Sequence, residues 1–260
     1  MKGIIFIDDK RYRHTQNYLE RTGHEFCSHT EPARNLDFVI FPFAAEINTA
    51  TFSNDFFADL RQDVQVFSGI RHSYVCDNCK LHDLNYHVLM DDKTIAAKNA
   101  VPTSEGVIAY LVQSRDKTIA GSRVLIVGYG ICGRDLALRL HGLGADVTTL
   151  VRRDEKAREA RSDGVSVTFL QQFDGLDFDI IINTVPATVL TAQMLENRAD
   201  VLFIDIASRP YGLDMELCKR LNPHSALLSG IPGKYAVKTA GEILGEHIHQ
   251  ILGGAQNNGY

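Results

Sequence analysis

The chain has 260 residues, of which 45 % are hydrophobic and 23 % charged, the composition of an ordinary globular protein with one large domain or two modest ones. Its 27 basic and 32 acidic residues give a formal net charge of −5, which argues against partners such as nucleic acid or an anionic membrane. No apolar run approaches the roughly 20 residues that a transmembrane helix needs. Residues 1–9 are too short and too acidic for a signal peptide, and the five cysteines therefore predict reduced thiols in a cytoplasmic protein.

The N-terminal part of the chain alternates short apolar runs with helical patterns. The apolar runs predict buried strands at residues 3–7, 38–41, 64–67 and 87–90. Residues 12–21 and 54–61 show helical periodicity, with Asn54 as the N-cap of the second helix. Strands that alternate with helices indicate a mostly parallel, doubly wound sheet. We therefore expect a flavodoxin- or Rossmann-like domain over residues 1–98, on the substrate side of the protein.

A break at residues 91–93 precedes a segment that is typical of a helix start. Pro102 lies beside Thr103, a favourable N-cap residue, and Glu105 follows in the expected first turn. We therefore expect a linking helix within residues 99–120 that begins near Thr103 and bridges two domains.

From residue 121 the pattern becomes regular. It predicts strands at residues 124–127, 147–151, 165–169, 180–183, 201–206 and 226–228. Six strands are the full count of a Rossmann sheet, so we expect a dinucleotide-binding Rossmann domain over residues 121–237. A helix at residues 238–252 opens a C-terminal segment, 238–260, that should pack back on the N-terminal domain. The predicted fold class is α/β, with two doubly wound Rossmann-like domains, the C-terminal one containing a six-stranded parallel NAD(P)-binding sheet.

A glycine-rich turn follows the strand predicted at residues 124–127. It consists of Gly128, Tyr129, Gly130, Ile131, Cys132 and Gly133, and an apolar-periodic helix comes after it. In a dinucleotide-binding fingerprint the first glycine allows the tight turn, the second lets the backbone approach the pyrophosphate, and the third lets helix and strand pack closely. The helix N-terminus offers unpaired N–H groups to the phosphates. We expect this turn to bind the cofactor; the alternative is a glycine-rich turn without a ligand.

The residues after the second strand of this domain decide between NAD and NADP. An NAD site has Asp or Glu there, which binds the ribose hydroxyls. This chain has Arg152 and Arg153, and the nearest acid, Asp154, comes one position too late. A guanidinium can pair with a 2′-phosphate, which a carboxylate would repel. The sequence favours NADP, with a solvated basic turn that still accepts NAD as the alternative.

Four further segments, read together with the glycine-rich turn, resemble one family. They are residues 99–106 (NAVPTSEG), 183–186 (NTVP), 205–210 (DIASRP) and 230–241 (GIPG followed by KTAG). In this order they are similar to the A subunit of bacterial dipicolinate synthase, closely over residues 99–252 and more loosely over the first domain. The family tends to have glycine where this chain has Tyr211, and arginine where it has Ile131.

The resemblance implies an activity and partners. The activity is an NADP-dependent oxidation, during sporulation, of a dihydrodipicolinate-type precursor to dipicolinate (pyridine-2,6-dicarboxylate). The implied partners are this small dicarboxylate substrate and the flavoprotein-like B subunit of dipicolinate synthase, in the cytoplasm of the mother cell. We also expect a homo-oligomer.

Three loops leave the carboxyl ends of predicted strands, where doubly wound sheets bind their ligands. We expect these loops to line the nicotinamide side of the cleft, with cofactor contacts from Asn183, Thr184, Val185, Pro186, Asp205 and Ala207. A dicarboxylate needs fixed cations or hydrogen-bond donors. The substrate-binding candidates are Arg209, Ser208, Thr103 and Lys98.

Hydride transfer is performed by the cofactor and needs no nucleophile from the protein. No residue in the sequence stands out as the catalytic base. Glu105, as a proton acceptor, and Lys238 are the catalytic candidates, and Lys238 could also join Arg209 as a cation that binds the substrate. A structural role is the alternative for each of these residues and for Arg209. Glu105 could simply be an acid in the first turn of its helix, and Lys238 the first residue of the last helix. Arg209 could be an exposed charge on a loop.

Two cysteines at Cys76 and Cys79 have the spacing of a zinc or redox pair. A second pair is missing, so two ordinary thiols on a helix are favoured and no metal site is expected. For the whole chain, two alternatives to the enzyme remain open. One is an NADP(H)-binding regulatory or partner-dependent subunit without turnover of its own, and the other is a shikimate-dehydrogenase-like reductase of another small carboxylate.

Overall fold

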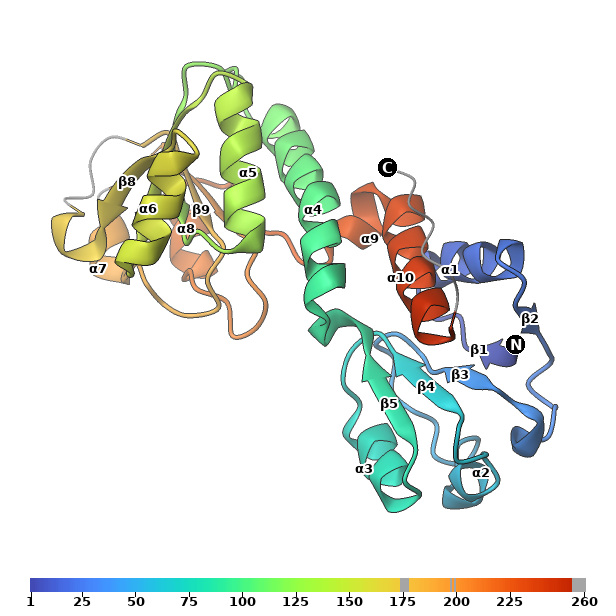
Figure 1. Cartoon of the computed structure of the whole chain (residues 1–260). Coiled ribbons are helices and arrows are strands. Elements are labelled where there is room, and N and C mark those ends of the chain that lie inside the picture. The colour runs from blue at the N-terminus through green and yellow to red at the C-terminus, as the bar shows by residue number, and fades with distance from the viewer. Residues whose placement is uncertain (174–177, 197, 199, 254–260) are drawn as a thin grey trace. The chain divides into compact units, whose positions relative to one another are not determined.

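The computed structural model describes residues 1–173, 178–196, 198 and 200–253, and the chain divides into two compact units (Figure 1). Unit 1 consists of Met1–Asn99 and Ala236–Tyr260, and unit 2 of Ala100–Tyr235. The C-terminal residues 254–260, part of the predicted last segment, lie outside the described residues. None of the described helices is long and apolar enough to cross a membrane.

Unit 1 is built on a five-stranded, all-parallel sheet. Its strands are β1 (Lys2–Ile5), β2 (Glu25–Phe26), β3 (Phe38–Ile40), β4 (Gln65–Ser68) and β5 (Asn85–Val88). Their spatial order is β2-β1-β3-β4-β5, which is the flavodoxin-like order. This confirms the predicted doubly wound α/β class, although the two-residue strand β2 was not predicted because it has no apolar run.

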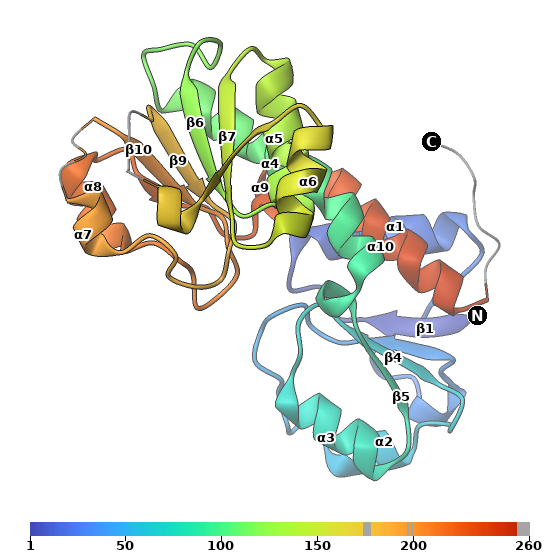
Figure 2. The ribbon, with the colours of Figure 1, turned by 60° about the vertical axis from the view of Figure 1, so that its left-hand side comes forward.

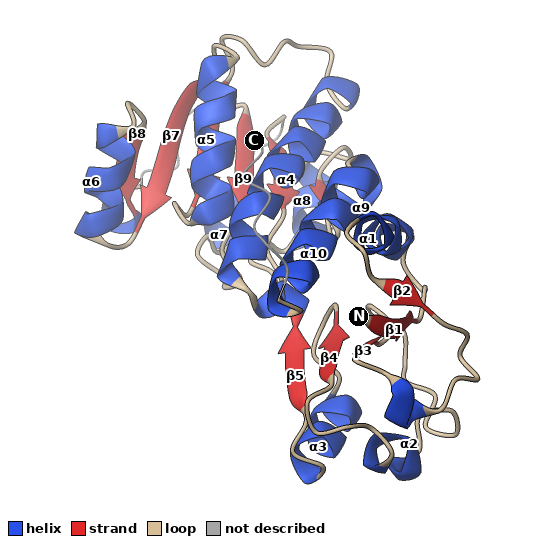
Figure 3. Ribbon diagram, turned by 45° about the vertical axis from the view of Figure 1, so that its right-hand side comes forward, coloured by secondary structure: helices blue, strands red, loops and turns tan. Residues whose placement is uncertain are grey.

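Helices cover both faces of this sheet (Figure 2, Figure 3). They are α1 (Lys10–Arg21), α2 (Asn54–Ala58), α3 (Ser73–Leu81) and α10 (Val237–Ile251). Because side chains alternate along a strand, Ile5 packs with α1 and α10 in one core, whereas Ile4 packs with α2 and α3 in the other. Helix α10 lies close against α1: a β-carbon on Gly241 would be 2.3 Å from the Arg11 carbonyl oxygen. The last helix of the chain is thus part of unit 1.

Unit 2 has a six-stranded, all-parallel sheet. Its strands are β6 (Arg123–Val127), β7 (Asp146–Val151), β8 (Ser166–Phe169), β9 (Ile180–Asn183), β10 (Leu202–Asp205) and β11 (Ala226–Leu227). The spatial order β11-β10-β9-β6-β7-β8 is that of the Rossmann fold. All six strands are those predicted, each within one residue of its expected ends, which confirms the six-stranded Rossmann sheet.

The helices of unit 2 again form two layers. They are the C-terminal part of α4 (Lys93–Gln113), α5 (Ile131–Gly142), α6 (Asp154–Ser162), α7 (Ala192–Leu195), α8 (Met215–Leu221) and α9 (Ile231–Tyr235). Buried residues of α4, α5, α6 and α9 share a core with Val124 and Ile126, whereas those of α7 and α8 pack with Leu125 and Val127. The strictly apolar run in β6 is explained by this burial on both faces.

The predicted start of the linking helix near Thr103 is wrong, because α4 begins ten residues earlier, at Lys93. Asp92 caps this helix: its carboxylate accepts hydrogen bonds from the N–H groups of Thr94 (2.7 Å) and Ile95 (3.1 Å). Pro102 lies inside the helix, where it lacks the N–H that would bond the Lys98 carbonyl. The predicted N-cap Asn54 is also wrong, since Ser53 holds that position and α2 ends already at Ala58.

Candidate nucleotide-binding site

A cavity of about 340 Å³ lies at the carboxyl end of the unit 2 sheet. It is formed by the ends of β6 and β7 and by the segment after β9, on both sides of the point where the strand order reverses. Its lining residues are Val127, Gly128, Tyr129, Gly130, Ile131, Cys132, Gly133, Leu150, Val151, Arg152, Arg153, Lys156, Thr184, Val185, Pro186 and Val189. The structure thus brings the whole glycine-rich turn, both arginines and three of the four residues 183–186 to one cavity.

Two of the glycines are needed by the fold itself. Gly128 has φ of +96°, a left-handed conformation that favours glycine, and its N–H donates to the Leu150 carbonyl at 2.9 Å. A β-carbon on Gly133 would lie 2.5 Å from the Gly128 carbonyl oxygen. Gly133 therefore allows the start of α5 to pack directly on the end of β6.

Gly130 differs from the other two, because a β-carbon there would meet nothing within 4 Å. It is the N-cap of α5, with no side chain capping the helix, and it faces the cavity. Free N–H groups at a helix N-terminus beside open space form a cradle for phosphate. The residues present therefore fit the pyrophosphate of a dinucleotide.

Positive charge gathers at the end of β7. Arg152 and Arg153 line the cavity, and their side chains make no ion pair in the part of the chain that the structure describes. Lys156, in the first turn of α6, lines the cavity as well, a position that the sequence analysis did not single out. The acids Asp154 and Glu155 do not line it.

A polar cluster ties the glycine-rich turn to α6. The Tyr129 hydroxyl donates to Asp163 Oδ2 at 2.8 Å, and Arg134 donates to both Asp163 oxygens at 2.7 and 2.9 Å. The bond from Arg134 lowers the pKa of Asp163, while burial and the bond to Asp163 raise the pKa of Tyr129. Sequence spacing gave no sign of this cluster, because Asp163 lies 29 positions beyond Arg134.

Asn183 and Asp205 were expected to contact the cofactor, but they are buried and do not line the cavity. The Asp205 carboxylate accepts hydrogen bonds from Asn183 Nδ2 (3.0 Å) and from the N–H groups of Ala207 (2.9 Å), Gly212 and Leu213 (both 2.8 Å). Asp205 therefore shapes the loop after β10 from within. Ala207, likewise buried, belongs to this framework rather than to the cavity wall.

The loop after β10 carries two substrate-binding candidates on its surface. Ser208 and Arg209 are exposed, and Arg209 Nε donates to the Tyr211 hydroxyl at 3.4 Å. Tyr211 has φ of +68°, a left-handed conformation, at the position where the resemblance led us to expect glycine.

The other candidates are spread over both units. In unit 2, Thr103 is half-buried inside α4, and the exposed Glu105 pairs with Arg139 of α5 at 3.8 Å. In unit 1, Lys98 pairs with Glu246 at 2.6 Å, and Lys238 opens onto a surface hollow between α1 and α10. Lys238 therefore does not line the nucleotide cavity, and Glu105 and Lys98 already have charged partners.

The cysteine pair lies on α3 in unit 1. Cys79 is buried in the core, and burial raises the pKa of its thiol to about 12, whereas Cys76 is half-buried. Among the described residues, no group of three or more His, Cys, Asp and Glu side chains is arranged to hold a metal ion.

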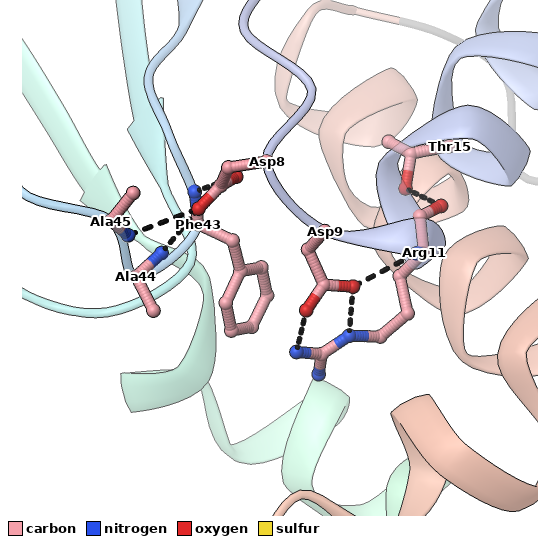
Figure 4. A network of polar contacts seen from close by, with 7 residues as sticks. All are labelled: Asp8, Asp9, Arg11, Thr15, Phe43, Ala44 and Ala45. Carbon is pink, nitrogen blue, oxygen red and sulfur yellow. Dashed lines mark hydrogen bonds and ion pairs between the residues drawn. The ribbon is translucent and has the colours of Figure 1, made fainter.

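The carboxyl end of the unit 1 sheet is occupied by its own side chains (Figure 4). Asp8, after β1, accepts hydrogen bonds of 2.5 to 3.0 Å from three consecutive N–H groups after β3, those of Phe43, Ala44 and Ala45. Arg11 is held by Asp9 and lies 3.8 Å from the centre of the Phe43 ring. These backbone donors are satisfied internally, so they do not form an open anion cradle like the one at Gly130.

Comparison with known proteins agrees with this geometry. The NAD-binding domain of the D-isomer specific 2-hydroxyacid dehydrogenases matches residues 96–200, which include the glycine-rich turn and both arginines. Together with the Rossmann sheet, this match indicates an oxidoreductase that uses a nicotinamide cofactor.

Relatives over nearly the whole chain are more specific. The A subunit of dipicolinate synthase from Bacillus subtilis is 30 % identical over 247 residues, covering 89 % of this chain and 83 % of that protein. The crystal structure of the dipicolinate synthase A chain from Bacillus subtilis superposes with a TM-score of 0.88 at 26 % identity, covering 97 % and 96 % of the two chains. The corresponding protein from Bacillus halodurans gives a TM-score of 0.87 at 25 % identity, with 98 % of each chain covered. The chain belongs to the family of dipicolinate synthase A subunits.

Proposed function

We propose that this protein is an NADP-dependent oxidoreductase that converts a dihydrodipicolinate-type precursor to dipicolinate during sporulation. The observation that carries the cofactor assignment is the cationic end of the cavity, where Arg152 and Arg153 follow β7 and none of the described acidic side chains lines the wall. The substrate assignment rests on family membership, because the relatives are dipicolinate synthase A subunits.

The preference for NADP over NAD follows from the charge at the ribose. In a Rossmann site the residue after the second strand reaches the adenosine ribose, and NAD sites use a carboxylate there. The position is taken here by two exposed guanidinium groups, which can pair with a 2′-phosphate through parallel hydrogen bonds. The acid Asp154 is the first residue of α6 and does not line the cavity.

For substrate recognition we propose Arg209, with support from Ser208 and Thr103. Arg209 is exposed on the loop that Asp205 holds from within, so a framework of buried hydrogen bonds supports an accessible cation. A planar guanidinium matches a carboxylate better than an ammonium does. When bound, the cofactor would accept a hydride from the substrate, and the chain's task is to bind and orient the two molecules. Lys98 and Glu105 would act only after leaving their present partners, Glu246 and Arg139.

Partners form part of the proposal. A flavoprotein-like B subunit would associate with this chain in the cytoplasm of the mother cell, and the chain itself would form a homo-oligomer. A second candidate is an NADP(H)-binding subunit that turns over only with its partner. It is supported by the ion pair between Glu105 and Arg139, because this candidate proton acceptor already has a charged partner.

Calorimetric titration with NADP and NAD tests the cofactor assignment. We expect wild-type protein to bind NADP at least tenfold more tightly, and Arg152→Asp to abolish or reverse this preference. Arg158→Asp is the matched control, because Arg158 is an exposed arginine on α6 outside the cavity. Equal affinities in the wild type would contradict the proposal. Turnover of dihydrodipicolinate by the purified single chain, compared with a mixture that also contains the B subunit, separates the enzyme from the partner-dependent alternative.

A further inference from the structure

Lys156 lines the cavity together with Arg152 and Arg153, although the sequence pattern did not predict this for the lysine. All five residues of the run 152–156 are charged, and the cations Arg152, Arg153 and Lys156 line the cavity whereas the acids Asp154 and Glu155 do not. We infer that Lys156 is the third cation of an adenosine 2′-phosphate subsite, and that Glu159 holds it in place until the phosphate arrives. This inference rests on the proposed NADP function.

The geometry of α6 supports this assignment. Lys156 lies in the first turn of the helix, directly after the two arginines, and its ammonium pairs with Glu159 one turn later. The two side chains are 27 % and 31 % exposed, so the lysine is held against the protein at the edge of the cavity. Arg153 caps α6 without a side-chain hydrogen bond, which leaves the helix N-terminus open to an anion beside the same three cations.

The ion pair between Lys156 and Glu159 is a weak competitor for a phosphate. Solvent-accessible pairs of this kind contribute little to stability, because water screens them and both side chains lose rotamer freedom. A phosphate monoester has a charge of about −1.5 to −2 and three strong acceptor oxygens. Transfer of the lysine from Glu159 to the phosphate is therefore favourable.

Glu159 keeps a partner after such a transfer. Its Oε1 lies 3.6 Å from Arg134 Nε, the guanidinium that also binds Asp163. No carboxylate is thus left without a counter-charge when Lys156 moves. NAD has no 2′-phosphate, so it would leave Lys156 on Glu159 and gain nothing from it.

Titration of three variants with NADP and with NAD tests the inference. Lys156→Gln should weaken NADP binding about tenfold and change NAD binding less than twofold, as expected for the loss of a charge-assisted hydrogen bond to phosphate. Glu159→Gln frees the lysine and should tighten NADP binding about twofold. The double variant should bind NADP like Lys156→Gln alone, because Glu159 acts through the lysine. Arg158→Gln, with the same charge change on α6 outside the cavity, should match the wild type.

Two kinds of failure can be told apart. If the wild type prefers NADP but Lys156→Gln binds both cofactors as the wild type does, or loses both equally, the inference is wrong and the proposed cofactor stands. If the wild type shows no preference for NADP, the proposed cofactor fails and the inference fails with it. Thermal unfolding of each variant confirms that the fold is retained.

Discussion

A single added methyl group should have different effects at Gly133 and Gly130, the two glycines at the start of α5: it should lower stability at the first and cofactor affinity at the second. In Gly133→Ala the new β-carbon would lie 2.5 Å from the Gly128 carbonyl oxygen, where neither backbone can yield easily. Overpacking of this kind costs about 3 kcal/mol, and the better helix propensity of alanine returns about 1 kcal/mol. We expect a net loss of about 2 kcal/mol in the free energy of unfolding, which lowers Tm by about 4–8 °C.

Gly130→Ala should leave the fold intact and weaken cofactor binding. Its β-carbon meets nothing within 4 Å, and its φ of −84° is accessible to any residue. Alanine is a poorer N-cap by about 0.5–1 kcal/mol, but it also restricts the unfolded chain, which returns about 0.4–1 kcal/mol. Tm should therefore stay within about 2 °C of the wild type. The methyl group projects where the pyrophosphate must approach, so NADP affinity should fall at least tenfold, the equivalent of one charge-assisted hydrogen bond, about 1.5–3 kcal/mol.

Circular dichroism melting curves and calorimetric titration with NADP measure both quantities on both variants. The reasoning is refuted if Gly130→Ala binds NADP as tightly as the wild type. It is also refuted if Gly130→Ala is the less stable of the two, since the open space beside Gly130 would then have another explanation. Comparing two glycines of one turn controls for general effects of mutating the loop.

Three further predictions concern the substrate loop and the core. Arg209→Ala should weaken dipicolinate binding by about 1.5–3 kcal/mol and leave NADP affinity within about twofold; a variant that loses NADP but keeps dipicolinate would place Arg209 on the wrong side of the site. Asp205→Ala should lower the free energy of unfolding in urea by at least about 3 kcal/mol, because three backbone N–H groups lose a buried acceptor; a loss below about 1 kcal/mol would contradict this account. The thiol of Cys79 has a pKa of about 12 in the folded chain. The folded state therefore keeps its proton above the ordinary thiol pKa of about 8.5, and between these values stability should fall as pH rises, by up to about 1.4 kcal/mol per pH unit. Cys79→Ala should show a shallower decline in alkaline denaturation curves, and an unchanged slope would argue against the burial effect.

The elements of unit 2 were predictable because their patterns are local. The apolar runs in β6 and β9 are uninterrupted, as they must be in strands buried on both faces, and turn residues bound them. Helix α4 was harder, because the pair Pro102 and Thr103 is a valid start signal that the structure does not use. Asp92 supplies the stronger cap, and the buried apolar face of α4 tolerates the lost hydrogen bond at Pro102.

The candidate site was predictable wherever a residue's role is set by its neighbours in sequence. The glycine-rich turn, Arg152 and Arg153 all follow directly from strand ends, and all line the cavity. The same reasoning failed for Asp205, which also ends a strand but points into the framework below the loop. Tyr211 is an intermediate case: the glycine expected there would suit the left-handed backbone, but this chain has a tyrosine in that conformation.

By itself, the sequence determined the fold class, the order of strands and helices along the chain, and the turn that suits a pyrophosphate. These depend on periodicity and on the conformational range of glycine, which are properties of short segments. Only the tertiary structure decided that Lys156 joins the arginines at the cavity, that Asp163 ties α6 to the glycine-rich turn, and that Lys98 is paired with Glu246. The bonds of Asp163 and the pair of Lys98 with Glu246 join distant parts of the chain, and such contacts leave no local pattern in the sequence. The place of Lys156 depends on how the first turn of α6 lies against the cavity, which the sequence does not show either.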